Sequence, residues 1–182
     1  MTRRSPLVLV LLLGLTLAGC SDPDDAIPPA LAELHQRAVA GDASAQLDLG
    51  LHYVTGRGIP PDEPAALRWI GKAAAQGHAA AQFELGSYYT LAPHQDYARA
   101  ADLLRRAALQ GFAPAQSSLA MLHLAGAGVP QDRIEAYAWL GLAAEPGERD
   151  ALELQPSVQA DLSDAELQQA WQRAQQYRQG PR

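Results

Sequence analysis

Histidine and cysteine are the side chains best suited to bind a metal ion or to serve as a catalytic base or nucleophile, and this chain has few of them. The histidines are His35, His52, His78, His94 and His123. None stands in a His-x-x-x-His pair, and a single cysteine rules out Cys-x-x-Cys. We therefore expect no metal site. His52 alone is a candidate for ligand contact, because His123 is expected to be buried and His94 solvated in a loop.

Other catalytic signatures are also missing. The chain has no Gly-x-Ser-x-Gly motif, and the pair Gly56-x-Gly58 lies in a turn that recurs later, which argues against a phosphate-binding loop. Asp62, Asp96 and Asp132 are spaced one per recurring unit, as helix N-caps would be. These patterns predict neither enzymatic activity nor a cofactor.

The one cysteine follows an N-terminal export signal. Arg3 and Arg4 precede an apolar run from Leu7 to Leu17, which is short for a membrane-spanning helix and typical of a signal peptide. The run ends in Leu17-Ala18-Gly19-Cys20, which resembles the bacterial lipobox. An ordinary cleaved signal or an N-terminal anchor is the alternative interpretation.

The lipobox resemblance implies cleavage of a signal peptide 1–19 and acylation of Cys20, which would anchor the protein to a membrane. Ser21, rather than aspartate, follows the cysteine, and this implies the outer membrane, facing the periplasm. Residues 20–28 are acidic and contain proline, as expected of a flexible tether.

Composition limits the partners further. The chain of 182 residues carries 14 basic and 20 acidic side chains, a net charge of −6, which argues against a nucleic-acid partner. Alanine and leucine dominate and aromatic residues are sparse, which favours helices. A single cysteine allows no disulfide within the chain.

Three similar units fill most of the chain. The Ala-Gln pairs Ala45-Gln46, Ala81-Gln82 and Ala115-Gln116 are separated by 36 and 34 residues. Further columns stay in register: Leu49, Leu85 and Leu119; Asp62, Asp96 and Asp132; Ala66, Ala100 and Ala136; Trp69, Leu103 and Trp139. This self-similarity predicts repeats at 41–76, 77–110 and 111–146.

Each unit has the pattern of two helices joined by a turn. In the first unit we expect a helix over 43–55, Gly56 as its left-handed end, Asp62 as the N-cap of a second helix, and Gly77 as its stop. The second unit lacks the Gly-x-Gly pair and is two residues shorter here, so its loop must close differently.

The shared pattern, with Ala45, Leu49-Gly50, Tyr53, Gly56-x-Gly58, Asp62 and Trp69 in the first unit, resembles the Sel1-like repeat, a relative of the tetratricopeptide repeat. The resemblance covers 41–146. It implies an all-α fold, a right-handed α-solenoid of helix-turn-helix repeats.

Such an array needs capping helices at both ends. We expect an N-terminal capping helix over 29–40, so that the repeat domain covers 29–146, and C-terminal capping helices over 147–179. The sequence Ser163-x-x-Glu166 predicts a capping box that opens a helix to about Tyr177. A helix between Glu148 and Leu162 is expected to break around Pro156.

The first helices of such repeats line a concave surface that binds peptides or protein segments. Partner-binding residues are therefore expected at the variable positions of these helices. They are Asp48, Glu84 and Ser118 in one row, and His52, Tyr88 and Leu122 in another.

Together these features predict a non-catalytic, lipid-anchored periplasmic scaffold or adaptor of the bacterial cell envelope, with a protein or peptide partner. One alternative is binding of cell-wall fragments (muropeptides or β-lactams), which the resemblance implies for cysteine-rich relatives whose disulfides this chain lacks. A second alternative is regulation of a membrane signalling sensor from the periplasm.

Overall fold

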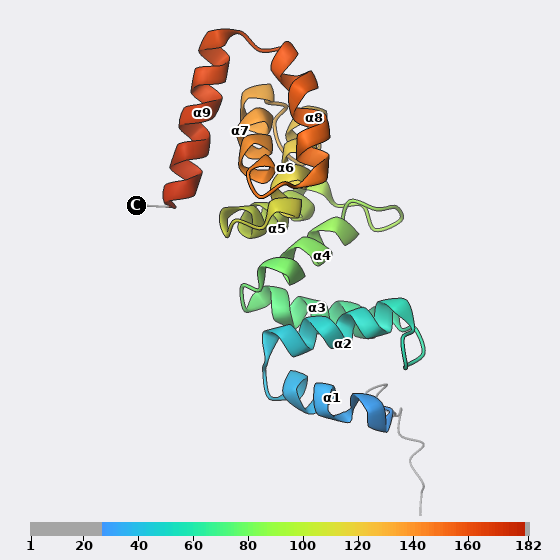
Figure 1. Cartoon of the computed structure of the whole chain (residues 1–182). Coiled ribbons are helices and arrows are strands. Elements are labelled where there is room, and N and C mark those ends of the chain that lie inside the picture. Colours follow the sequence, from blue (N-terminus) through green and yellow to red (C-terminus); the bar gives the residue numbers. More distant parts are fainter. Residues whose placement is uncertain (1–26, 181–182) are drawn as a thin grey trace, which may run out of the picture.

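The structure, a computed structural model, describes residues 27–180, and all regular structure in this range is helical (Figure 1). The predicted signal peptide, Cys20 and nearly all of the tether lie outside it. A 3₁₀ turn, Pro29–Leu31, precedes the helices α1 (Ala32–Val39), α2 (Ala43–Thr55), α3 (Glu63–Ala75), α4 (Ala79–Tyr88), α5 (Tyr97–Leu109), α6 (Ala113–Ala125), α7 (Arg133–Ala144), α8 (Arg149–Ala160) and α9 (Asp164–Gln179). Within residues 27–180, none of the helices combines the length and the hydropathy needed to cross a membrane.

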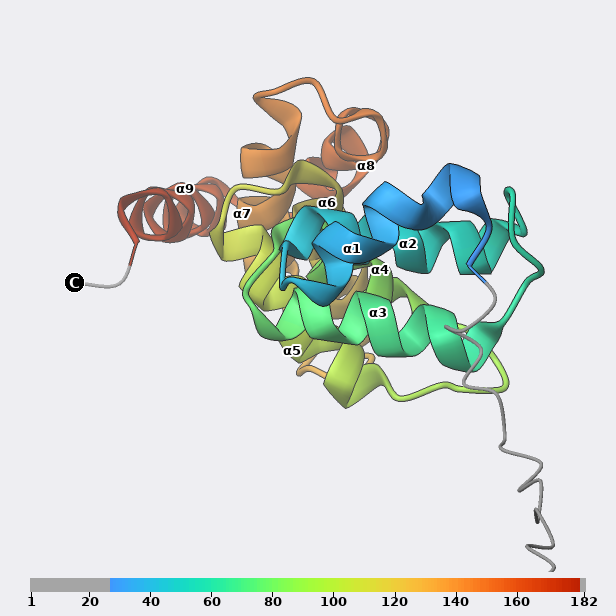
Figure 2. The same ribbon diagram turned by 90° about the horizontal axis from the view of Figure 1, so that it is seen from below.

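The helices stack as consecutive pairs. Helices α2 and α3, α4 and α5, and α6 and α7 pack within each repeat, while α3 contacts α4 and α5 contacts α6 between repeats. Helix α1 covers one end of the stack, and α8 and α9 cover the other (Figures 1 and 2). The predicted all-α solenoid is confirmed.

The ends of the helices carry the predicted caps. Asp62, Asp96 and Asp132 accept hydrogen bonds from backbone amides three residues ahead, at 2.8, 3.1 and 2.9 Å. Gly56 and Gly126 end α2 and α6 in the left-handed region, with φ of 69° and 67°. The aspartates are therefore structural N-caps.

One carbonyl at each repeat junction accepts two hydrogen bonds. The carbonyl one residue before the end of the preceding helix accepts the amide of the turn glycine and also a buried glutamine side chain of the next helix. The glutamine pairs are Gln46 with Ala38 at 2.9 Å, Gln82 with Ala74 at 3.2 Å, and Gln116 with Ala108 at 3.1 Å. These glutamines are only 4–5% exposed.

Small residues let the helices approach at these junctions. Ala45, Ala81 and Ala115, which precede the glutamines, are completely buried. Within the first repeat, a Cβ atom on Gly50 would lie 2.6 Å from Ile70 Cγ1, so α2 and α3 touch backbone to side chain. The small residues of the repeat pattern are thus a requirement of close packing.

The second repeat departs from the other two. Helix α4 has 10 residues, whereas α2 and α6 have 13 each. No positive-φ glycine follows α4, so the chain leaves the helix at Tyr88 and crosses to Asp96 in a loop of its own. The loop does close differently, as predicted from its length and lack of glycine.

The C-terminal helices differ in part from expectation. The capping box at Ser163 and Glu166 is present and opens α9. The predicted break at Pro156 is wrong, because α8 runs through it. Ala151 and Val158, on either side of the proline, are both buried, and their packing against the core holds the two halves of α8 in one helix.

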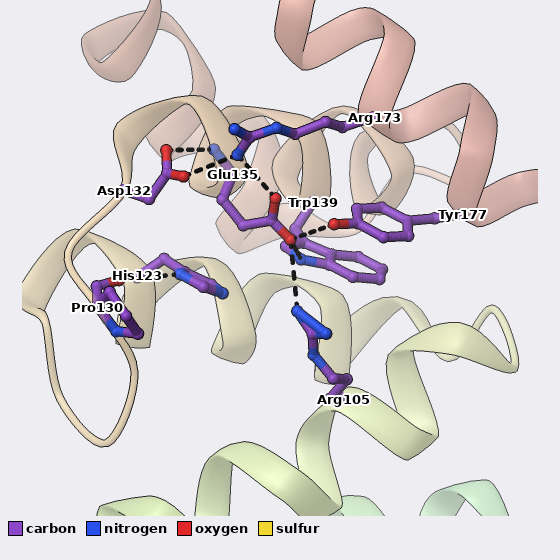
Figure 3. Close-up of polar contacts among 8 residues, drawn as sticks. All are labelled: Arg105, His123, Pro130, Asp132, Glu135, Trp139, Arg173 and Tyr177. Atoms are coloured by element: carbon purple, nitrogen blue, oxygen red, sulfur yellow. Dashed lines mark hydrogen bonds and ion pairs between the residues drawn. The ribbon is translucent and has the colours of Figure 1, made fainter.

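A buried carboxylate fastens α9 to the stack (Figure 3). Glu135, 5% exposed, accepts hydrogen bonds from Trp139 Nε1 at 3.0 Å, Tyr177 OH at 2.5 Å and Arg173 Nη1 at 3.0 Å. The Tyr177 ring stacks on Trp139 with centroids 4.2 Å apart. Arg173 also donates to Asp132 at 2.7 Å. We refer to Asp132, Glu135, Trp139, Arg173 and Tyr177 as the C-terminal clamp.

Electrostatics in the clamp follow from these contacts. Burial raises the pKa of Asp132, but the hydrogen bonds from Arg173 and the Glu135 amide outweigh it and hold the pKa below its ordinary value. Burial and the nearby Glu135 carboxylate both raise the pKa of Tyr177. Asp132 and Arg173 are therefore charged and Tyr177 is neutral at pH 7.

The glycine turns offer a test of how tightly the repeats pack. Gly58 and Gly128 occupy equivalent turn positions with φ of 79° and 70°. An added Cβ at Gly128 would lie 2.1 Å from the Tyr97 carbonyl oxygen, whereas at Gly58 the nearest atom is 4.0 Å away, on Leu31. Gly58→Ala should cost about 1–2 kcal/mol for the left-handed backbone alone. Gly128→Ala should lose roughly 1–3 kcal/mol more through overpacking, measured by chemical unfolding. Equal losses would contradict the tight contact.

The clamp gives a second test. Arg173→Met removes two charged hydrogen bonds and leaves the buried Glu135 with Arg105 as its cation, 3.7 Å away, so we expect a loss of roughly 1–3 kcal/mol and faster hydrogen exchange in α9. Arg178→Met is the control, because its partner Glu145 is exposed, and it should change stability by less than about 0.5 kcal/mol. Similar exchange in the two variants would show that the clamp does not hold α9.

Candidate functional site

An apolar groove opens between the first and second repeats. It encloses about 420 Å³ and lies among α2, α3, α4 and the loop after α4. Its lining consists of Tyr53, Val54, Pro61, Glu63, Ala66, Leu67, Ile70, Glu84, Leu85, Ser87, Tyr88 and Leu91. Among these described residues, only Glu63 and Glu84 are charged.

The groove exists because the second repeat packs less closely than the third. Leu119 of α6 is completely buried and Leu122 is 7% exposed, whereas their counterparts in α4, Leu85 and Tyr88, are only half-buried. Leu91 comes after the end of α4 and is 62% exposed at the rim. The shortened second repeat therefore leaves a hollow where the third repeat has core.

Tyr88 closes one side of the groove through polar contacts. Its hydroxyl donates to Glu63 Oε1 at 2.6 Å, and His94 Nε2 lies 3.1 Å from the same oxygen. The rings of Tyr88 and His94 stack with centroids 4.7 Å apart. Burial, followed by the Glu63 carboxylate, raises the pKa of Tyr88 to about 12. The phenol thus stays neutral and ties the end of α4 to the start of α3, while His94 ties the following loop to the same carboxylate.

Glu84 lies in the groove without such support. Its side chain is half-buried, and within residues 27–180 no hydrogen bond or ion pair is formed by its carboxylate. Burial raises the pKa of Glu84, because the charged form has lost part of its hydration. A half-buried carboxylate of this kind is suited to receive a cationic or hydrogen-bonding ligand group.

The structure separates the residues predicted to bind a partner. Glu84 and Tyr88 both line the groove. Asp48 is exposed on α2, outside the groove, and Ser118 is half-buried on α6. The side chains of the two remaining predicted residues contact other parts of the same chain. His52 Nδ1 lies 2.5 Å from the Arg57 carbonyl, and Leu122 is part of the core.

Sequence reasoning did not find the apolar part of the site. Val54, Leu67 and Leu91 contribute to the groove but fall outside the rows of variable positions used for prediction. The sequence feature that could have indicated these residues is the shorter loop of the second repeat, because a shorter loop changes the packing of the helices around it. His94, expected to be a solvated loop residue, is exposed but contacts both Glu63 and Tyr88.

The described residues that line the groove include no cysteine or histidine. The Tyr88 hydroxyl is hydrogen-bonded to the Glu63 carboxylate, and its raised pKa keeps it neutral at pH 7. In the part of the chain that the structure describes, no three histidine, cysteine, aspartate or glutamate side chains gather as a metal site requires. The groove therefore presents a mostly apolar surface with two carboxylates, Glu63 and Glu84.

Comparison with protein families accounts for the repeats. The family model of the Sel1 repeat matches residues 43–78, 79–112 and 113–147. The chain belongs to the Sel1 repeat family. The matched units begin two residues later than the boundaries that we predicted, and each starts at the first helix of a pair.

Solved structures agree with this assignment. A Sel1 repeat protein from Oxalobacter formigenes is similar at 33% identity and a TM-score of 0.66, over 70% of this chain and 98% of that one. A protective antigen of uropathogenic Escherichia coli strains, with an SLR fold, is similar at 35% identity and a TM-score of 0.73. That match covers 81% of this chain but only 32% of the antigen. None of the curated proteins matches the chain.

Membership of the family limits the function in general terms. Sel1 repeats generally mediate protein–protein interactions, and proteins built from them are typically non-catalytic scaffolds. An apolar groove between two repeats of this Sel1 chain fits that role.

The carboxylate in the groove predicts a pH-dependent stability. Because the pKa of Glu84 is raised in the folded protein, protonation of Glu84 stabilises the fold at pH values below its ordinary pKa of 4.5. This stabilisation is lost as the pH rises through the raised pKa of the folded protein. Glu84→Gln should therefore melt higher than the wild type at pH 7, with the difference shrinking toward pH 4. Asp48→Asn removes the equivalent, exposed carboxylate and should give a smaller difference. A Glu84→Gln difference independent of pH would contradict the assignment.

Proposed function

We propose that this protein is a non-catalytic scaffold of the bacterial cell envelope that holds a segment of a partner protein in the groove between its first two repeats. The observation that carries the proposal is the groove itself, an apolar hollow of about 420 Å³ with exposed Val54 and Leu91 at its rim. Apolar concave sites with few polar groups are the usual form of binding sites.

Attachment to the envelope is the second part of the proposal. The sequence Leu17-Ala18-Gly19-Cys20 supports acylation of Cys20, and Ser21 supports the outer membrane with the domain facing the periplasm. A lipid anchor would keep the repeats close to a membrane and raise the local concentration of partners there. In this setting a scaffold can assemble envelope proteins or regulate a membrane sensor.

Cell-wall fragments are a weaker candidate for the groove. Muropeptides and β-lactams carry carboxylates, and the charged residues in the described lining, Glu63 and Glu84, are also acidic. Like charges in a partly desolvated site repel, so these ligands are disfavoured relative to an apolar polypeptide segment.

The experiment is photocrosslinking in the native envelope. A photoreactive residue at Leu91, on the groove rim, should label a specific protein, and Ser87→Trp, which fills the groove, should abolish that label. A photoreactive residue at Leu152, exposed on α8, is the control position. Undiminished labelling in a Ser87→Trp variant of wild-type melting temperature would contradict the groove as the partner site.

The anchor is checked in the same cells. Cys20→Ala should move the protein from the membrane fraction to the soluble periplasmic fraction, because acylation needs the thiol. If the Cys20→Ala protein stays in the membrane fraction to the same extent, lipidation at this position is not what holds it there.

A further inference from the structure

We propose that the segment recognised by the groove is a cationic amphipathic one, whose apolar side chains enter the hollow while a lysine or arginine pairs with Glu84. This inference rests on the proposed scaffold function and names the chemistry of its partner. It follows from the charge of the lining, the state of Glu84 and the space available.

The charge of the groove has one sign. Glu63 and Glu84 line it, and no lysine, arginine or histidine is among the described lining residues. The whole chain is also acidic, with a net charge of −6. An acidic partner would be repelled from this site, while a basic one is attracted both at long range and on contact.

The two carboxylates differ in what they offer. Glu63 Oε1 already accepts the Tyr88 hydroxyl at 2.6 Å and lies 3.1 Å from His94. Glu84 is half-buried and, within residues 27–180, makes no hydrogen bond or ion pair. Partial burial has already removed some of its hydration, which also raises its pKa, so a cation bound there would replace water that is partly lost. Glu84 is therefore the residue that selects a positively charged side chain in the bound segment.

The hollow has room for the apolar part of such a segment. A cavity of roughly 150 Å³ holds one benzene-sized group. The groove, at about 420 Å³, therefore accommodates two or three large apolar side chains. Val54 and Leu91, 56% and 62% exposed, extend the apolar surface to the rim and would be covered by the same segment.

The chain's own tether does not fit this description. Residues 20–28 contain three aspartates and neither lysine nor arginine. The tether would therefore bring negative charge to Glu84. The occupant we infer is a basic segment of another protein.

The test selects ligands without assuming their sequence. Full-length protein in detergent micelles is used to pan a phage-displayed library of random peptides. Enriched peptides should carry lysine or arginine close to leucine, phenylalanine or methionine. Their Kd is then measured for the wild type, Glu84→Gln, Asp48→Asn and Ser87→Trp. Glu84→Gln should weaken binding roughly tenfold or more, Ser87→Trp should abolish it, and Asp48→Asn should leave it unchanged.

Three results would overturn the inference, and they bear differently on the scaffold proposal. Peptides that bind Glu84→Gln as tightly as the wild type but fail to bind Ser87→Trp would keep the groove and reject the cation pairing. Peptides that bind Ser87→Trp as tightly as the wild type would reject the groove and leave a scaffold that uses another surface. Enrichment of acidic or uncharged peptides alone, or of none, would reject a basic occupant.

Discussion

The structure depends on a carbonyl that accepts two hydrogen bonds at every repeat junction. The amide of a turn glycine and a buried glutamine side chain both donate to it, as at Ala74 with Gly77 and Gln82. The glutamine thereby ties each first helix to the end of the helix before it, and a fully buried alanine beside it lets the two approach. A buried side-chain amide needs acceptors, so a shift of one helix along the other would deprive the glutamine of its carbonyl partner.

The same requirement explains where the array ends. Helix α8 starts as a fourth unit would, with Gly147 donating to the Ala144 carbonyl and Ala151 completely buried. The position of the glutamine is taken by Leu152, which is 51% exposed and cannot donate. Helix α9 then turns back to pack on α7 through the C-terminal clamp (Figures 1 and 3). Leu152 in place of a glutamine and the buried Glu135 thus distinguish the end of the array from its repeats.

The caps and turns that recur in the sequence could be predicted, whereas packing that is peculiar to one repeat could not. Repeated columns such as Asp62 and Gly56 report backbone geometry directly, so the caps and turns were found at the expected residues. The groove arises from a deletion in the second repeat, and a deletion does not say how the neighbours repack. Glu84 and Tyr88 were found because they are variable residues of α4, but Leu122 shows that the same row turns into core where the packing is tighter. The continuous α8 likewise depends on burial of Ala151 and Val158, which outweighs the local effect of Pro156.

The hydrophobic core of this stack is divided into separate clusters, and this division affects where the stack can bend. One cluster joins α1 to α3 around Tyr53 and Trp69, and a larger one joins α5 to α9 around Trp139. Between them lies a small cluster made mostly of alanines, beside the groove and the short helix α4. Bending is easiest where the least apolar surface is packed. The two larger clusters can therefore move relative to each other about α4. A segment bound beside α4 would add packed surface at this position and restrict the bending.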